Sequence, residues 1–177
     1  GKSVCVFFGK TGVIAFDFDG KQLWKKSMGT MSGSKRWGAA SSPILYKDTV
    51  IVNASDEGRK IVALDKATGK EKWNAPADSL DLTYNTPLVV TVSPTRKDLV
   101  IAVPEELWGM NPDTGKLRWY AEMKPNGNIS PSVVYDGSVV YATGGYRVKG
   151  TVAIQAGGKG NVTTSRKKWA SPDSSYV

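Results

Sequence analysis

The chain has 177 residues, of which 40% are hydrophobic and 23% charged. This composition is typical of a folded protein and excludes an intrinsically disordered chain. The sequence contains no histidine, which excludes Ser-His-Asp and Cys-His nucleophilic sites and histidine-containing zinc sites. Its single cysteine excludes an intrachain disulfide.

The first apolar segments lie near the N-terminus. Residues 4–8 read Val-Cys-Val-Phe-Phe, and residues 15–24 read Ala-Phe-Asp-Phe-Asp-Gly-Lys-Gln-Leu-Trp. We predict β-strands in both segments, because Gly-containing turns separate short apolar runs. Cys5 is then a buried strand thiol, since no neighbour supplies the positive charge that a reactive thiol needs.

The second unit of the chain contains more segments. Ser-Pro-Ile-Leu-Tyr at 42–46 and Val-Ile-Val at 50–52 precede Ala-Leu-Asp-Lys-Ala-Thr-Gly-Lys-Glu-Lys-Trp at 63–73. Pro43 suits the first residue of a strand, one of the few places where a strand accepts proline. Gly69 in the Thr-Gly turn can adopt a positive φ without a Cβ clash.

The third and fourth units repeat this order. In the third, the strand-like segments 86–90 and 99–103 precede a motif at 109–119 in which asparagine replaces the aspartate. In the fourth, the corresponding segments are 130–134, 139–142 and 152–154, ending at Trp169. Glycines between residues 157 and 160 lengthen the last turn, so the fourth unit is the degenerate copy.

Four tryptophans mark the period of the repeat. Trp24, Trp73, Trp119 and Trp169 are separated by 49, 46 and 50 residues. The apolar runs are four to seven residues long and rich in β-branched residues, which favours strands over the helices of a solenoid. Four short strands in a unit of this length are typical of a β-propeller blade.

The motif Ala-Xaa-Asp-Xaa-Xaa-Thr-Gly-Lys-Xaa-Xaa-Trp resembles the tryptophan-docking repeat of the quinoprotein-type, or PQQ-like, propellers. That family includes the pyrroloquinoline quinone (PQQ) dehydrogenases and the propeller lipoprotein of the outer-membrane barrel-assembly machinery. The resemblance implies that the motif tryptophans Trp24, Trp73, Trp119 and Trp169 are structural and dock between blades. Each would lie on the Thr-Gly turn of the next blade, where glycine permits close approach of a large flat ring.

The fold expected from these observations is all-β, a partial propeller of about four four-stranded antiparallel blades. The blades are expected at about 1–29 (partial), 39–79, 84–124 and 128–170, with 171–177 starting another. The resemblance implies a ring of eight blades. The remaining blades would belong to a longer protein from which this segment is cut, or two copies of the chain would pair as a homodimer to complete a ring.

Candidate binding residues are expected in the loops that lead into the innermost strands, because propellers bind ligands at the mouth of the central channel. These loops carry aromatic, hydroxyl and amide side chains suited to a polar or planar partner. The residues are Trp37, Ser42, Tyr84, Asn85, Asn128 and Ser130. Ordinary ordered turns are the alternative interpretation.

The leading functional hypothesis is a non-catalytic module that binds protein or acts as a scaffold in the cell envelope. No catalytic, cofactor-binding or metal-binding residue is assigned. The alternative is part of a PQQ-dependent dehydrogenase with PQQ and calcium, but the chain lacks the family's cysteine pair, and only Asp78 and Asp81 lie near a mouth loop.

The net charge of +8 is mostly scattered over turns, with its densest patch at residues 166–168. Nucleic acid is therefore not the expected partner. No apolar run reaches the roughly 18 residues of a transmembrane helix. The family resemblance implies a periplasmic or other extracytoplasmic location.

Overall fold

The computed structural model describes residues 2–146 and 148–172, which form four separate sheets. The first sheet contains β1 (Val4–Phe7), β2 (Val13–Phe16) and β3 (Gln22–Lys26). The second contains β4 (Ile44–Tyr46), β5 (Thr49–Ala54), β6 (Lys60–Asp65) and β7 (Glu71–Pro76). Within both sheets, strands that are consecutive in sequence pair antiparallel.

The third and fourth sheets follow the same plan with one addition. The third contains β8 (Leu88–Ser93), β9 (Arg96–Val103), β10 (Glu106–Met110) and β11 (Leu117–Glu122). The fourth contains β12 (Val134–Tyr135), β13 (Val139–Gly144), β14 (Gly150–Gln155) and β16 (Lys167–Ser171). The addition is β15 (Gly160–Asn161), which comes from the fourth unit but pairs parallel with β11 of the third.

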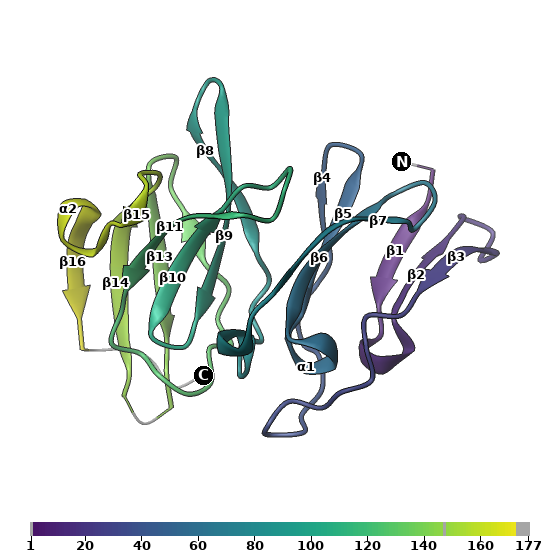
Figure 1. Ribbon diagram of the computed structural model, residues 1–177, viewed down its shortest axis with the longest axis horizontal. Helices are drawn as coiled ribbons and strands as arrows, with labels where there is room; N and C mark the ends of the chain where they lie inside the picture. The colour runs from purple at the N-terminus through teal and green to yellow at the C-terminus, as the bar shows by residue number, and fades with distance from the viewer. Residues whose placement is uncertain (1, 147, 173–177) are drawn as a thin grey trace.

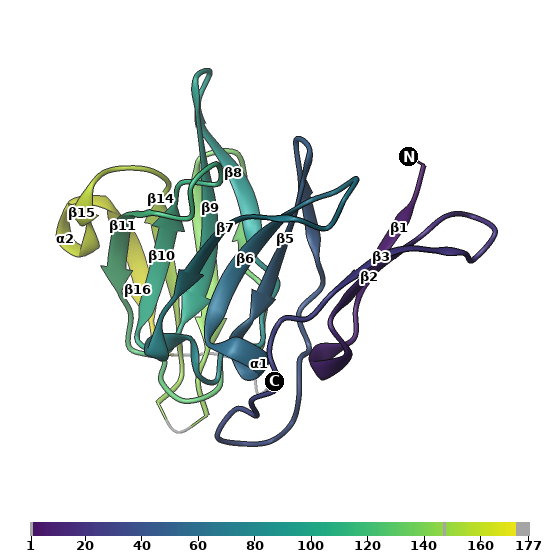
Figure 2. The same ribbon diagram turned by 45° about the vertical axis from the view of Figure 1, so that its right-hand side comes forward.

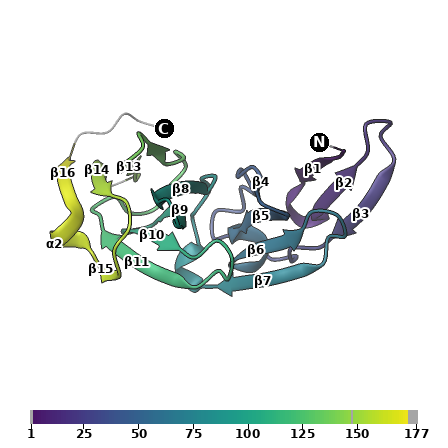
Figure 3. The ribbon, with the colours of Figure 1, turned by 90° about the horizontal axis from the view of Figure 1, so that it is seen from above.

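The four sheets stand side by side along an arc (Figures 1 and 3). Viewed from above, β3, β7 and β11 follow its outer side, whereas β1, β4 and β8 lie toward its inner side (Figure 3). Within the described residues, four short helical turns interrupt the loops: η1 (Gly9–Thr11), α1 (Ser55–Gly58), η2 (Asp78–Leu80) and α2 (Thr163–Arg166). This arrangement confirms the expected fold class, an all-β partial propeller whose sheets are its blades.

The core lies between blades rather than within any one of them. In β5, Val50 and Val52 pack with the first blade, whereas Ile51 packs with the third. All six residues of β5 are buried, because successive side chains point to opposite faces and both faces are covered. The repeat therefore stabilises the fold by stacking, since no blade buries its apolar faces alone.

A bulge recurs at the same place in every blade. The register of the third strand against the fourth shifts at the motif position before the turn. The shifts lie between Ala15 and Phe16, Ala63 and Leu64, Gly109 and Met110, and Ala153 and Ile154. A bulge increases local twist, so each motif turn is aimed in the same way relative to its blade.

The C-terminal expectation concerns residues 171–177, of which 173–177 lie outside the described residues. Within the part of the chain that the structure describes, no helix is long and apolar enough to cross a membrane.

Candidate functional site

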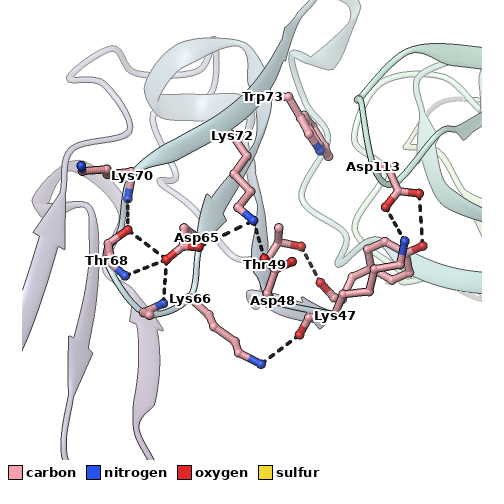
Figure 4. A network of polar contacts seen from close by, with 12 residues as sticks. Lys47, Asp48, Thr49, Asp65, Lys66, Thr68, Lys70, Lys72, Trp73 and Asp113 are labelled. Atoms are coloured by element: carbon pink, nitrogen blue, oxygen red, sulfur yellow. Dashed lines mark hydrogen bonds and ion pairs between the residues drawn. The ribbon is translucent and has the colours of Figure 1, made fainter.

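The motif turn of the second blade is held by its aspartate (Figure 4). Asp65 accepts hydrogen bonds from the amides of Ala67 and Thr68 at 3.1 and 2.9 Å, and from the Thr68 hydroxyl at 2.9 Å. These bonds, chiefly those from Thr68, hold the pKa of Asp65 below its usual value. Gly69 completes the turn with a φ of 70°, which a residue with a Cβ rarely adopts.

Two motif tryptophans lie directly on the turn of the following blade. The Trp24 indole N–H donates to the carbonyl of Lys66 at 3.2 Å, and that of Trp73 donates to Pro112 at 3.1 Å. A Cβ on Gly69 would lie 2.6 Å from Cε3 of Trp24, and one on Gly115 would lie 2.5 Å from Cε3 of Trp73. Glycine is therefore required at both turns, because the ring occupies the space of a side chain.

The other two motif tryptophans lie differently. Trp119 is completely buried in the hydrophobic cluster shared by the third and fourth blades. Its indole N–H, however, donates a hydrogen bond of 2.7 Å to Asp98 of its own blade. The expected docking of Trp119 on a Thr-Gly turn is not what the structure shows, since the degenerate fourth unit has no such turn. Trp169 is 47% exposed on β16, where its ring lies 6.1 Å from that of Tyr141.

An ion pair links the β4–β5 turn of the second blade to the motif turn of the third blade. Lys47 Nζ lies 2.6 Å from Asp113 Oδ1 in the next motif turn, and the side chains are drawn in Figure 4. Both side chains are more than half exposed, so this pair is screened by solvent and adds little to stability. The turn edge of the blades is thus occupied by structural contacts.

The six candidate binding residues lie at the opposite edge, and the structure divides them. Trp37 and Ser42 are exposed, and Asn128 and Ser130 are half-buried. Tyr84 and Asn85 are buried, and Asn85 Nδ2 donates to the carbonyl of Ala102 at 2.6 Å. The structure brings Trp37 and Tyr84 together, with ring centroids 5.6 Å apart. It does not bring the six residues into one pocket.

Beneath this edge lies a cluster of buried polar groups, of which only Tyr84 and Asn85 were expected from the sequence to be binding residues. Every buried side-chain N or O atom without a hydrogen-bond partner, among the residues described, belongs to it. The side chains are Asn53, Asp56, Glu57, Arg59, Thr83, Tyr84 and Asn85. An unpaired buried polar group costs free energy, so such a concentration in one place is a signal of function or of bound water.

Local sequence could have pointed to this cluster. The connection from β5 to β6 contains α1 and is polar from Ser55 to Arg59, whereas Pro104 and Glu105 suffice between β9 and β10. Figure 2 shows α1 at the loop edge of the second blade, beside the first. The short polar insertion distinguishes the second blade from the third.

Burial and neighbouring groups together set the acid–base properties of the cluster and of Asp81, which pairs with Arg59 of the cluster. Burial raises the pKa of Tyr84 to about 12, with a further contribution from the charges of Asp56 and Asp81. Burial also raises the pKa of Glu57, against hydrogen bonds from its own amide and that of Ala39. For Asp81, burial is outweighed by hydrogen bonds from Ser34 and by Arg59, so its pKa is lowered.

The acidic residues of this edge do not form a calcium site. Calcium in proteins takes six to eight oxygen ligands, among them carboxylates. Across residues 2–146 and 148–172, no three Asp, Glu, Cys or His side chains come together in a group that could hold a metal ion.

Sheets of this form, with motif turns packed against tryptophans, define a propeller of the PQQ-like repeat class. The model of the family described as outer membrane protein assembly factor BamB matches residues 1–177. The chain belongs to that family. A comparison with curated proteins found no match.

Solved structures share the fold at low sequence identity. BamB from Moraxella catarrhalis matches with a TM-score of 0.67 and 19% identity, over 97% of this chain and 49% of that one. The quinohemoprotein alcohol dehydrogenase ADHIIG from Pseudomonas putida HK5 matches with a TM-score of 0.67 and 16% identity, over 96% and 32%. The quinohemoprotein alcohol dehydrogenase from Comamonas testosteroni matches with a TM-score of 0.65 and 16% identity, over 96% of this chain and 33% of that one. The chain thus spans half or less of these proteins.

Proposed function

We propose that this chain is part of a non-catalytic propeller module that binds a protein partner in the cell envelope. The observation that carries the proposal is Trp37, which is 64% exposed on the loop edge and backed by the buried ring of Tyr84. Tryptophan is the residue most enriched among binding hot spots. Membership of the assembly-factor family supports the same role and an extracytoplasmic location.

The loop that carries Trp37 is held in place from several sides. Gly38 donates its amide to Asp56 at 3.0 Å, Met31 donates to the carbonyl of Glu57 at 3.1 Å, and the Ser34 hydroxyl donates to Asp81 at 2.5 Å. An exposed aromatic ring on an ordered loop loses little conformational entropy on binding, which favours affinity.

The test is binding of the purified chain to the barrel-assembly machinery of its host, measured by interferometry. We expect Trp37→Ala to weaken binding at least tenfold, whereas Phe18→Ala leaves it unchanged. Phe18 is the matched control, an aromatic residue that is 72% exposed in the β2–β3 turn. Absence of binding by the unaltered chain, or equal loss in both variants, would refute the proposal.

A second candidate is part of a PQQ-dependent dehydrogenase, which the likeness to two quinohemoprotein alcohol dehydrogenases favours. A titration with PQQ and calcium, followed by absorbance, separates the two. Stoichiometric binding of PQQ would support the dehydrogenase and count against the scaffold.

The location is tested by fractionating host cells and by protease access to the parent protein in opened envelopes.

The comparisons give no support to the pairing of two copies into a ring. Sedimentation velocity measures that pairing directly, and a compact dimer at micromolar concentration would restore it.

A further inference from the structure

A cavity of about 200 Å³ lies between the first and second blades at the loop edge, and Trp37 contributes to its lining. Its lining combines η1, the loop before β4 and α1. A water molecule occupies about 30 Å³ of liquid, so the cavity has room for several waters or one small organic molecule.

Two carboxylates form the inner part of this lining. Asp56 and Glu57 are each 1% exposed, and each has one buried carboxylate oxygen without a hydrogen-bond partner, Oδ1 and Oε2 respectively. In the described parts of the chain, no cation forms an ion pair with either residue. Two buried carboxylates side by side without a counter-charge are costly, so the site favours a ligand that brings a positive group.

The outer part of the lining carries the opposite charge. Lys10 and Arg36 are exposed and line the same cavity. Lys10 Nζ donates a hydrogen bond to the Ser32 hydroxyl at 2.7 Å. Its charge lowers the pKa of Glu57 only weakly. The charges are therefore segregated, with negative groups inside and positive groups at the opening.

We propose that this cavity binds a small zwitterionic amine of the amino-acid class. Its ammonium group lies against Asp56 and Glu57, and its carboxylate lies toward Lys10 and Arg36. Charge-assisted hydrogen bonds to buried carboxylates are stronger than neutral ones, so the inner contact supplies most of the affinity. The opening selects against cations that carry no carboxylate, because Lys10 and Arg36 repel them.

Glycine is the probe for this proposal, and the test is a titration of the 15N-labelled chain followed by NMR. The amide of Gly38, which donates to Asp56, and the indole of Trp37 report on the cavity directly. We expect saturable shifts of both signals with glycine and at least tenfold weaker binding of glycinamide, which lacks the carboxylate. N-acetylglycine, which lacks the ammonium group, is expected not to bind.

Variants locate the site. Glu57→Gln and Asp56→Asn keep the shape of each side chain and are expected to weaken glycine binding at least tenfold. Asp19→Asn, in the exposed β2–β3 turn, is the control and is expected to bind as the unaltered chain does. Melting curves of all three exclude loss of folding as the cause.

Three results would overturn the proposal. They are no saturable shift with glycine at tens of millimolar, glycine affinity unchanged in folded Glu57→Gln and Asp56→Asn, and equal affinity for glycinamide. All three are read from the binding of glycine and its analogues and not from protein binding, so the two proposals fail separately.

Discussion

The interface between the second and third blades and that between the third and fourth solve the same packing problem in different ways. In the former, Trp73 reaches across to the turn of the next blade and donates to Pro112. In the latter, Trp119 donates to Asp98 of its own blade, and the carbonyl of Ala156, equivalent to that of Pro112, accepts from Arg166 instead.

The interface between the third and fourth blades, here called the irregular interface, replaces one indole contact with several other contacts. Arg96 of the third blade donates to the carbonyl of Gly158 at 3.0 Å, and β15 pairs with β11. Gly109 stands where the other blades have alanine, and a Cβ there would lie 1.9 Å from Cε2 of Trp119. The position of the Trp119 ring against its own blade therefore depends on glycine at 109. In the same way, the docking of the Trp73 ring on the next blade depends on Gly115.

Loss of the Asp98 charge should break the irregular interface most severely. Asp98 is completely buried and accepts from Arg96, Arg118 and Trp119. Asp98→Asn should cost about 4 kcal/mol in the free energy of unfolding, because it leaves two arginines without their charged partner. Urea unfolding measures this, with Asp113→Asn as the exposed control that should lose far less.

The same carboxylate predicts a pH dependence. Burial raises the pKa of Asp98, but hydrogen bonds from Arg96, Trp119 and Arg118 outweigh it and lower the pKa below its ordinary value. The unfolded chain then binds the proton more readily than the folded chain. The stability from Asp98 is complete above its ordinary pKa, about 3.9, and is lost as pH falls through the folded value. An Asp98→Asn protein that keeps the same acid slope in urea unfolding between pH 5 and 2 would contradict this.

Gly109→Ala tests why Trp119 turns inward. The added methyl group should cost about 3 kcal/mol by overpacking, although alanine suits the equivalent position 63. Urea unfolding gives the cost, and tryptophan fluorescence shows whether Trp119 has moved to a more exposed position. An unchanged stability together with unchanged fluorescence would show that the space is not limiting.

Removal of the indole N–H compares how much one hydrogen bond contributes to stability at each of the two interfaces. Trp119→Phe loses a bond to a buried carboxylate and should cost about 2 kcal/mol beyond the change in ring area. Trp73→Phe loses a bond to a neutral carbonyl and should cost about 1 kcal/mol on the same basis. Equal losses in urea unfolding would remove the distinction.

Tyr84→Phe should have the smallest effect, because the Tyr84 hydroxyl is buried without a partner among the described residues. We expect a change within about 0.5 kcal/mol of zero in the free energy of unfolding. A loss of more than about 1 kcal/mol would mean that bound water or a ligand pairs with this hydroxyl.

Much of the fold could be predicted from the sequence because its signals are local. The apolar runs of 63–73 and 109–119, their Thr-Gly turns and the spacing of their tryptophans identified the blades, and the fold class was correct. The candidate binding residues stay a prediction. Trp37 is exposed as a binding residue requires, whereas Tyr84 and Asn85 are buried among polar groups that the loop sequence alone did not reveal.

The sequence by itself determined the repeat, the strands and the places where glycine is needed for a turn, since these depend on neighbours a few residues apart. Only the tertiary structure decided which way Trp119 points, where β15 pairs and which carboxylates lack a partner. Each of these depends on contacts between blades, such as Arg96 with Gly158, that join residues far apart in the chain. The stacking of unlike neighbours makes the interface between the third and fourth blades differ although the repeat that builds it is the same.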